Sequence, residues 1–152
     1  MTKTTTGDEN GNFLAGSSWF ERDYIFFKKL DLLINDSNRI GKEELFEQRK
    51  KFFPELLGSD LENVTKNLRL FKKTSFISII KRDIDSKATL EENLSSLSSL
   101  AEICIQSALV DSMKYHANKL NMMPESYRRK SELFIIAMGK LGGRELNASS
   151  DI

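Results

Sequence analysis

A long run of apolar residues at helical spacing, between Leu90 and Tyr115, limits the possible folds of this 152-residue chain more than any other feature. Its apolar positions recur in alternating steps of four and three, at Leu90, Leu94, Leu97, Ala101, Cys104 and Ala108. Thr89 and Glu92 form a capping box, which satisfies free N–H groups at a helix start. The serine-rich residues 95–99 keep the same period and predict helix rather than linker. We therefore expect the long helix of a bundle, of about 30 residues.

Two shorter helices are predicted in the first third of the chain. The first runs from a serine cap at residue 17 or 18 to about residue 35. Its apolar stripe consists of Phe20, Tyr24, Phe27, Leu30 and Ile34. The second starts near Lys42, and Pro54 predicts a break or kink just before it, because proline lacks the N–H and clashes with the preceding turn.

A third helix is predicted to begin at a second capping box, Ser59–Glu62. Its first half carries one apolar stripe, made of Leu61, Val64, Leu68 and Phe71. The apolar residues of its second half fall nearly on the opposite side and are Phe76, Ile77, Ile80 and Ile84. Either the second half packs against a different neighbour, or the helix is interrupted.

Composition indicates a folded protein, with 39% hydrophobic and 30% charged residues. The net charge of +1 gives no general attraction to nucleic acid. The apolar runs are far shorter than the roughly 20 residues that cross a bilayer. Residues 1–12 are polar, and the N-terminus lacks the apolar part of a secretory signal. We expect a flexible N-terminus and a cytoplasmic protein with neither nucleic acid nor a membrane as partner.

The single cysteine and the single histidine suggest no chemistry of their own. Cys104 excludes an internal disulfide and fits a core position on the long helix. His116 has no cysteine, carboxylate or second histidine at a metal-binding spacing, so we expect a solvated or hydrogen-bonded side chain.

A glycine-rich segment follows a short apolar run near the end of the chain. Residues 134–138 are apolar throughout and predict a short buried strand. Gly139, Gly142 and Gly143 then predict a tight turn whose N–H groups can approach an anion such as phosphate. Residues 144–146 suit a short helix whose N-terminus would face the same anion. Neither the dinucleotide-binding glycine pattern nor the P-loop pattern is present.

The sequence GKLGGRELN at 139–147, followed by SSDI at 149–152, resembles the signature of bifunctional glutamine synthetase adenylyltransferase/adenylyl-removing enzymes. The wider polymerase-β-like nucleotidyltransferase superfamily has a glycine turn, about ten intervening residues and then Asp-hydrophobic-Asp. Here ten residues separate Lys140 from Asp151. The resemblance covers residues 13–152 and is less specific in the helices, where it draws attention to Arg69 and Arg82.

The resemblance implies a Mg²⁺-dependent site. Asp151 would be the catalytic carboxylate and metal ligand, and the nucleotide or phosphate would contact Gly139, Lys140, Gly142, Gly143 and Ser150. Two aspartates separated by one residue on a strand share a face and can hold two cations on one phosphate. The second aspartate would follow Ile152, so we expect this fragment alone to be inactive.

Enzymes of this kind have two related halves, and the resemblance implies a role in regulating nitrogen assimilation. One half removes AMP from a tyrosine of glutamine synthetase by phosphorolysis, consuming phosphate and releasing ADP, and the other attaches AMP from ATP. A single helical module before the motif favours the N-terminal, adenylyl-removing half. Glutamine synthetase and the PII signalling protein are the implied partners. The alternative is a helical protein-interaction module with a structural glycine turn.

The expected fold is mainly α. An α-helical module would occupy residues 17–120. Residues 121–152 would form the first strand, turn and helix of a truncated α+β nucleotidyltransferase core.

Overall fold

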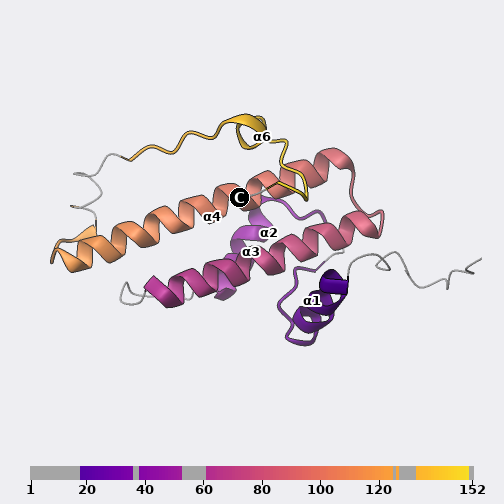
Figure 1. Cartoon of the computed structure of the whole chain (residues 1–152), viewed down its shortest axis with the longest axis horizontal. Coiled ribbons are helices and arrows are strands. Elements are labelled where there is room, and N and C mark those ends of the chain that lie inside the picture. Colours follow the sequence, from indigo (N-terminus) through magenta and orange to yellow (C-terminus); the bar gives the residue numbers. More distant parts are fainter. Residues whose placement is uncertain (1–17, 36–37, 53–60, 125, 127–132, 151–152) are drawn as a thin grey trace, which may run out of the picture.

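A computed structural model describes residues 18–35, 38–52, 61–124, 126 and 133–150, and these residues are mainly helical, as predicted. The helices are α1 (Ser18–Lys29), α2 (Lys42–Phe52), α3 (Leu61–Ile84), α4 (Leu90–Lys119) and α6 (Gly139–Gly142). The two longest helices, α3 and α4, form an antiparallel hairpin (Figure 1). Helix α2 packs against both of them, and α1 packs against α3.

The turn between α3 and α4 is closed by a buried arginine. Arg82 is 5% exposed, and its Nη2 donates to the Lys87 carbonyl at 2.8 Å and to the Glu92 carboxylate at 2.9 Å. The Thr89 hydroxyl accepts from the Glu92 N–H at 3.2 Å, which confirms the predicted cap of α4. Because the guanidinium joins both helices and their connection, Arg82 stabilises the hairpin rather than facing a ligand.

The main core lies where α2, α3 and α4 meet. Phe71 of α3 is fully buried at its centre, with its ring centroid 6.3 Å from that of Phe52 in α2. The other buried members are Ile40, Leu45, Ile79, Leu97, Leu100, Ala101, Ile103, Cys104 and Leu146. Leu146 belongs to the C-terminal segment, so the residues after the glycines also contribute to this core.

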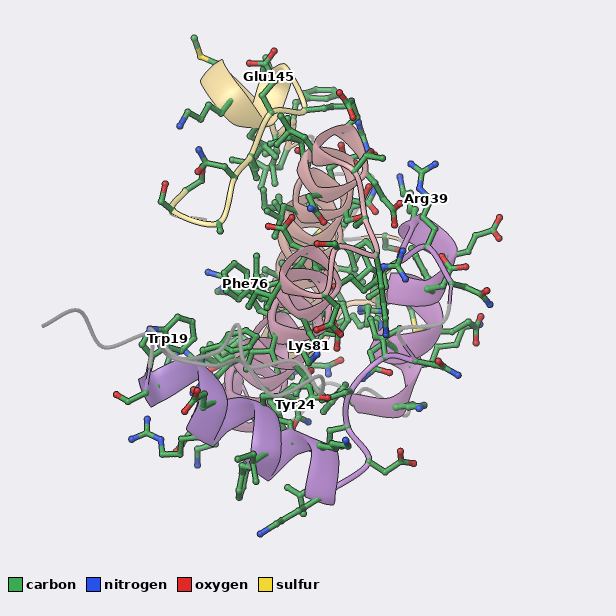
Figure 2. All side chains as sticks on the ribbon, turned by 90° about the vertical axis from the view of Figure 1, so that its right-hand side faces the viewer. Trp19, Tyr24, Arg39, Phe76, Lys81 and Glu145 are labelled. Atoms are coloured by element: carbon green, nitrogen blue, oxygen red, sulfur yellow. The ribbon has the colours of Figure 1, made fainter. Side chains whose placement is uncertain are left out.

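Helix α3 is continuous, and its second half packs against a different neighbour. Ile77 forms a smaller cluster with Phe20 and Phe27 of α1. An ion pair between Lys73 and the buried Asp23, at 2.7 Å, fixes the same contact. The first of the two predicted alternatives is thus confirmed. Figure 2 shows α1, with Trp19 and Tyr24, in the lower part of the view. Glu145, on the C-terminal turn, lies at the top.

Helix α4 is buried on all sides at its centre, from residue 96 to residue 101. The predicted apolar stripe is therefore correct at Leu97, Ala101 and Cys104, but wrong at its ends. Leu90 is 67% exposed and Ala108 is also exposed. The centre has neighbours all round, because α2 and α3 cover one side and the C-terminal segment approaches the other.

Buried serines hold the irregular segments against the long helices. The Ser96 hydroxyl of α4 donates to the Ile40 carbonyl at 2.6 Å. The Ser78 hydroxyl of α3 accepts from the Ile34 N–H at 3.0 Å. A small side chain with one donor and two acceptor positions lets a loop backbone come close and satisfies its polar groups. The serine-rich stretch of α4 is consequently a docking surface for other segments.

Helix α1 is shorter than predicted. It ends at Lys29 instead of near residue 35, because Asp31 takes a left-handed conformation with φ of 53° and the chain turns there. The predicted flexible residues 1–16, the break near Pro54 and the serine of the second capping box lie outside the described residues.

The predicted buried strand at residues 134–138 is wrong. No strand occurs among the residues that the structure describes, and this segment runs beside α4 without regular structure (Figure 1). Phe134, Ile136 and Met138 are 80%, 83% and 82% exposed. A strand requires a neighbouring strand to pair with its N–H and C=O groups, and no described part of the chain supplies one.

Candidate functional site

The glycines after residue 138 form one helical turn, α6, whose hydrogen bonds are largely internal. The N–H groups of Gly142 and Gly143 donate to the carbonyls of Met138 at 3.2 Å and Gly139 at 2.9 Å. The N–H groups of Arg144 and Glu145 also donate to carbonyls within the turn. The amides at the start of the turn, at residues 139–141, are therefore the ones that an approaching anion can use. Phosphate binding by this segment stays a prediction.

Two of the glycines are favoured by the backbone geometry. Gly139 has a φ of 56°, in the left-handed region that side chains rarely adopt. A Cβ at Gly142 would lie 2.6 Å from the Ala137 carbonyl oxygen, too close without a shift of the backbone. Gly143 differs from both, because its φ is −80° and a Cβ there would meet nothing closer than 3.5 Å.

The predicted helix at residues 144–146 is also wrong, since the helical turn lies earlier. Arg144 has a φ of 58°, which ends α6, and residues 145–147 are irregular. The helix thus occupies the glycines themselves, and the residues after them carry the chain back to α4.

The turn is docked on α4 by one arginine and one leucine. Arg144 Nη1 is paired with the carboxylate of Glu102, and Nη2 donates to the Ser99 hydroxyl at 2.9 Å. Leu146 is 4% exposed in the main core, and its N–H donates to the Ser98 hydroxyl at 3.4 Å. Serine and glutamate side chains of the central helix therefore determine where the turn lies.

The residues after the turn are organised by an asparagine. The Asn147 side-chain oxygen accepts from the hydroxyls of Ser149 and Ser150, each at 2.9 Å. The half-buried Ser150 also accepts from the Asn147 N–H at 3.2 Å. Ser150 is thus held in place directly before Asp151, which itself lies outside the described residues.

The charged side chains of the turn are open to solvent. Lys140 and Glu145 are both exposed, so the ammonium group of Lys140 can meet an anion in solution. No three histidine, cysteine, aspartate or glutamate side chains come together as a metal site in the described part of the chain. The described residues alone do not make up a Mg²⁺ site.

The other residues with reactive side chains lie in places that do not indicate catalysis. Burial raises the pKa of the Cys104 thiol to about 11, which keeps it neutral and unreactive near neutral pH. His116 is exposed, as predicted, and its ring lies edge-on to Tyr115 with the centroids 5.4 Å apart. Arg69 is exposed on α3.

Sequence reasoning missed the residues that dock the turn. Ser98, Ser99 and Glu102 lie more than 40 positions before Arg144, and the sequence predicted no contact between them. The available signal was the row of serines in a helix that otherwise carries leucines, because a helix face lined by small polar residues can accept a loop.

Gly142→Ala is expected to loosen the turn, whereas Gly143→Ala should be tolerated. The clash with the Ala137 carbonyl should cost about 1–3 kcal/mol locally. Hydrogen exchange at the Glu145 N–H, which bonds to the Lys140 carbonyl at 2.7 Å, should then be about tenfold faster or more. Equal exchange in the two variants would contradict this geometry.

Comparison with known proteins identifies the family of this chain. A family model described as glutamate-ammonia ligase adenylyltransferase matches residues 22–152. A protein from Shewanella woodyi is 36% identical over 124 residues, which are 81% of this chain and 13% of the relative. Proteins from Nitrosococcus oceani and Chromobacterium violaceum are 40% and 39% identical over 86 and 85 residues, 56% of this chain and 9% and 10% of the relatives. All three are named bifunctional glutamine synthetase adenylyltransferase/adenylyl-removing enzyme.

The fold and the turn define a helical module that presents a glycine-rich turn on its central helix. Because the family model covers most of the sequence, the chain belongs to the glutamate-ammonia ligase adenylyltransferase family. It spans about a tenth of the length of the curated relatives it matches. No solved structure matches it significantly. Within the described ranges, no helix is both long and apolar enough to span a membrane.

Proposed function

We propose that this segment belongs to an enzyme that removes AMP from an adenylylated tyrosine of glutamine synthetase by phosphorolysis, releasing ADP. The observation that carries the proposal is the family match, which extends through the GKLGGRELN and SSDI signature to residue 152. The described part of this signature, as far as Ser150, is held against the helical module. Leu146 is buried in the main core, and Ser150 is held directly before Asp151.

The proposed roles follow the signature. The turn with Gly139, Lys140, Gly142 and Gly143 would approach the phosphate groups, through the first amides of α6 and the exposed Lys140 ammonium. Ser150 would present its hydroxyl beside them. Asp151 would hold Mg²⁺, which neutralises charge on the attacked phosphate when bound. ATP or ADP, phosphate, glutamine synthetase and the PII protein are the proposed ligands and partners.

We assign the segment to the adenylyl-removing half and not to the adenylyl-transferring half. The support is the resemblance of residues 90–102 to the stretch before the N-terminal site. The segment by itself is proposed to be inactive, because a single carboxylate cannot hold two cations in the geometry that the transfer requires.

The nucleotide that is released distinguishes phosphorolysis from hydrolysis and from AMP transfer. A full-length enzyme containing this segment should release ADP when incubated with adenylylated glutamine synthetase, Mg²⁺ and phosphate, and omission of phosphate should stop the release. Release of AMP without phosphate would indicate hydrolysis instead. If no nucleotide is released by a protein that still transfers AMP from ATP, the proposed half is wrong.

A second candidate function, a protein-interaction module, is favoured by one specific observation. Helix α1 and the residue after it leave large apolar side chains in solvent, with Trp19, Phe26 and Leu30 at 48%, 55% and 52% exposure. A protein partner could cover them. This function would take the place of the enzyme if the full-length protein neither removes nor transfers AMP.

A further inference from the structure

The glycine turn meets the helical module through a small polar network on α4. Glu102 is the shared member. Its Oε2 lies 3.6 Å from the Lys42 ammonium at the start of α2, and its Oε1 accepts from Arg144. The same guanidinium reaches the buried hydroxyl of Ser99 at 2.9 Å. One arginine of the signature segment is therefore joined to two positions one helical turn apart on α4, and through Glu102 to α2.

This arrangement is better suited to fixing a position than to stabilising the fold. The Arg144 and Glu102 side chains are 48% and 33% exposed, and ion pairs so exposed add little stability. Arg144 nevertheless holds a left-handed backbone conformation, with φ of 58°, at the residue that ends α6. A non-glycine residue keeps such a conformation only where its surroundings hold it there, and here its side chain is held at two points.

The fixed position matters for the residues that follow. Only six residues separate Arg144 from Asp151, and two of them are also held, since Leu146 is buried and Ser150 is bonded to Asn147. An arginine that fixes the turn therefore also limits where Ser150, the residue before Asp151, can lie. Displacement of a reacting group by about 1 Å can cost 100-fold in rate.

We propose that Arg144 is a positioning residue, which places the glycine turn and the segment that follows it as far as Ser150, by pairing with Glu102 and Ser99 on the central helix. Glu102 makes the positioning depend on α2 as well, because it pairs with Lys42. The inference rests on the proposed function for its catalytic consequence. The contacts of Arg144 with Glu102 and Ser99, which we call the clamp, can be tested without reference to the proposed function.

The first test is hydrogen exchange on the 152-residue chain. Arg144→Ala and Glu102→Ala should each speed exchange at residues 143–146 about tenfold, and leave the α3–α4 core unchanged. The reversed pair, Arg144→Glu with Glu102→Arg, should slow it again only in part, because an arginine at position 102 is repelled by Lys42. Arg144→Lys should give an intermediate rate, because lysine keeps the charge but not the forked contact. The control Lys50→Ala breaks a more exposed pair with Glu47 on α2 and should change nothing in the turn.

The second test measures AMP removal in a full-length enzyme containing this segment. Arg144→Ala should lower kcat about 10- to 100-fold and change KM for adenylylated glutamine synthetase less than about threefold. The reversed pair should recover part of kcat.

The outcomes separate the two proposals. Unchanged exchange at residues 143–146 in Arg144→Ala overturns the clamp, whatever the activity. Faster exchange with unchanged kcat in an active enzyme overturns the positioning role. A wild-type enzyme that releases no ADP overturns the proposed function and with it the catalytic consequence. The exchange rates still decide whether the clamp exists.

Discussion

Phe71→Ala is expected to lower the free energy of unfolding of this chain by about 3–5 kcal/mol. The ring is fully buried at the centre of the main core, where α2, α3 and α4 meet, and contacts Phe52. Its removal leaves a cavity that three packed helices can only partly close. Urea denaturation followed by circular dichroism measures the change.

The matched control is the same substitution at an exposed phenylalanine. Phe26 on α1 is 55% exposed, so Phe26→Ala should change the free energy of unfolding by less than about 1 kcal/mol. If Phe71→Ala leaves too little folded protein, Phe71→Leu provides a smaller loss at the same position. Similar losses at Phe71 and Phe26 would contradict the packing described for the hairpin.

Asp151→Asn, in a full-length enzyme containing this segment, is expected to reduce AMP removal by two or more orders of magnitude, which corresponds to about 3 kcal/mol or more in the barrier. The amide is nearly the same size as the carboxylate but lacks the charge that holds a hard cation. The helical module should stay folded, because its core lies in α2, α3 and α4, with Leu146 the member nearest the substitution.

Glu145→Gln is the control for the removal of one negative charge near the turn. Glu145 is exposed and six residues before Asp151, so its loss should leave the rate within about threefold. Near-normal AMP removal by a folded Asp151→Asn enzyme would remove Asp151 from the site. The interaction-module function would then become the better account of this segment.

The helices could be predicted from sequence because their signals are local. Thr89 and Glu92 lie three residues apart, and the cap they predicted is present. The change of apolar face within α3 was also visible, and α1 accounts for it through Phe20 and Phe27. The spacing of nearby residues was enough to predict these features, since each depends on residues within a few helical turns.

The features that could not be predicted depend on residues far apart in the sequence. Residues 134–138 have the composition of a buried strand, but a strand exists only with a partner. The exposed ends of the α4 stripe, at Leu90 and Ala108, depend on where the other helices stop. The docking of Arg144 on Glu102 joins positions 42 residues apart, and neither side chain carries a local signal of that contact.

Of the candidate site, the glycine turn was predicted from the sequence, but its detailed geometry was predicted only in part. The glycine turn is present, with Gly139 at a positive φ that favours glycine and Gly142 where a Cβ would clash with the Ala137 carbonyl. Its helix lies at the glycines themselves and not after them, because left-handed Arg144 ends it. The metal ligand Asp151 and the bound phosphate stay predictions.

The most direct test of the account is to measure both opposing activities of one full-length enzyme, before and after Asp151→Asn. ADP release from adenylylated glutamine synthetase and phosphate reports AMP removal, and incorporation of AMP from ATP reports its attachment. We predict that the substitution abolishes ADP release and leaves AMP incorporation near its original rate. Loss of incorporation with intact ADP release would contradict the account, since it would place this segment in the adenylyl-transferring half.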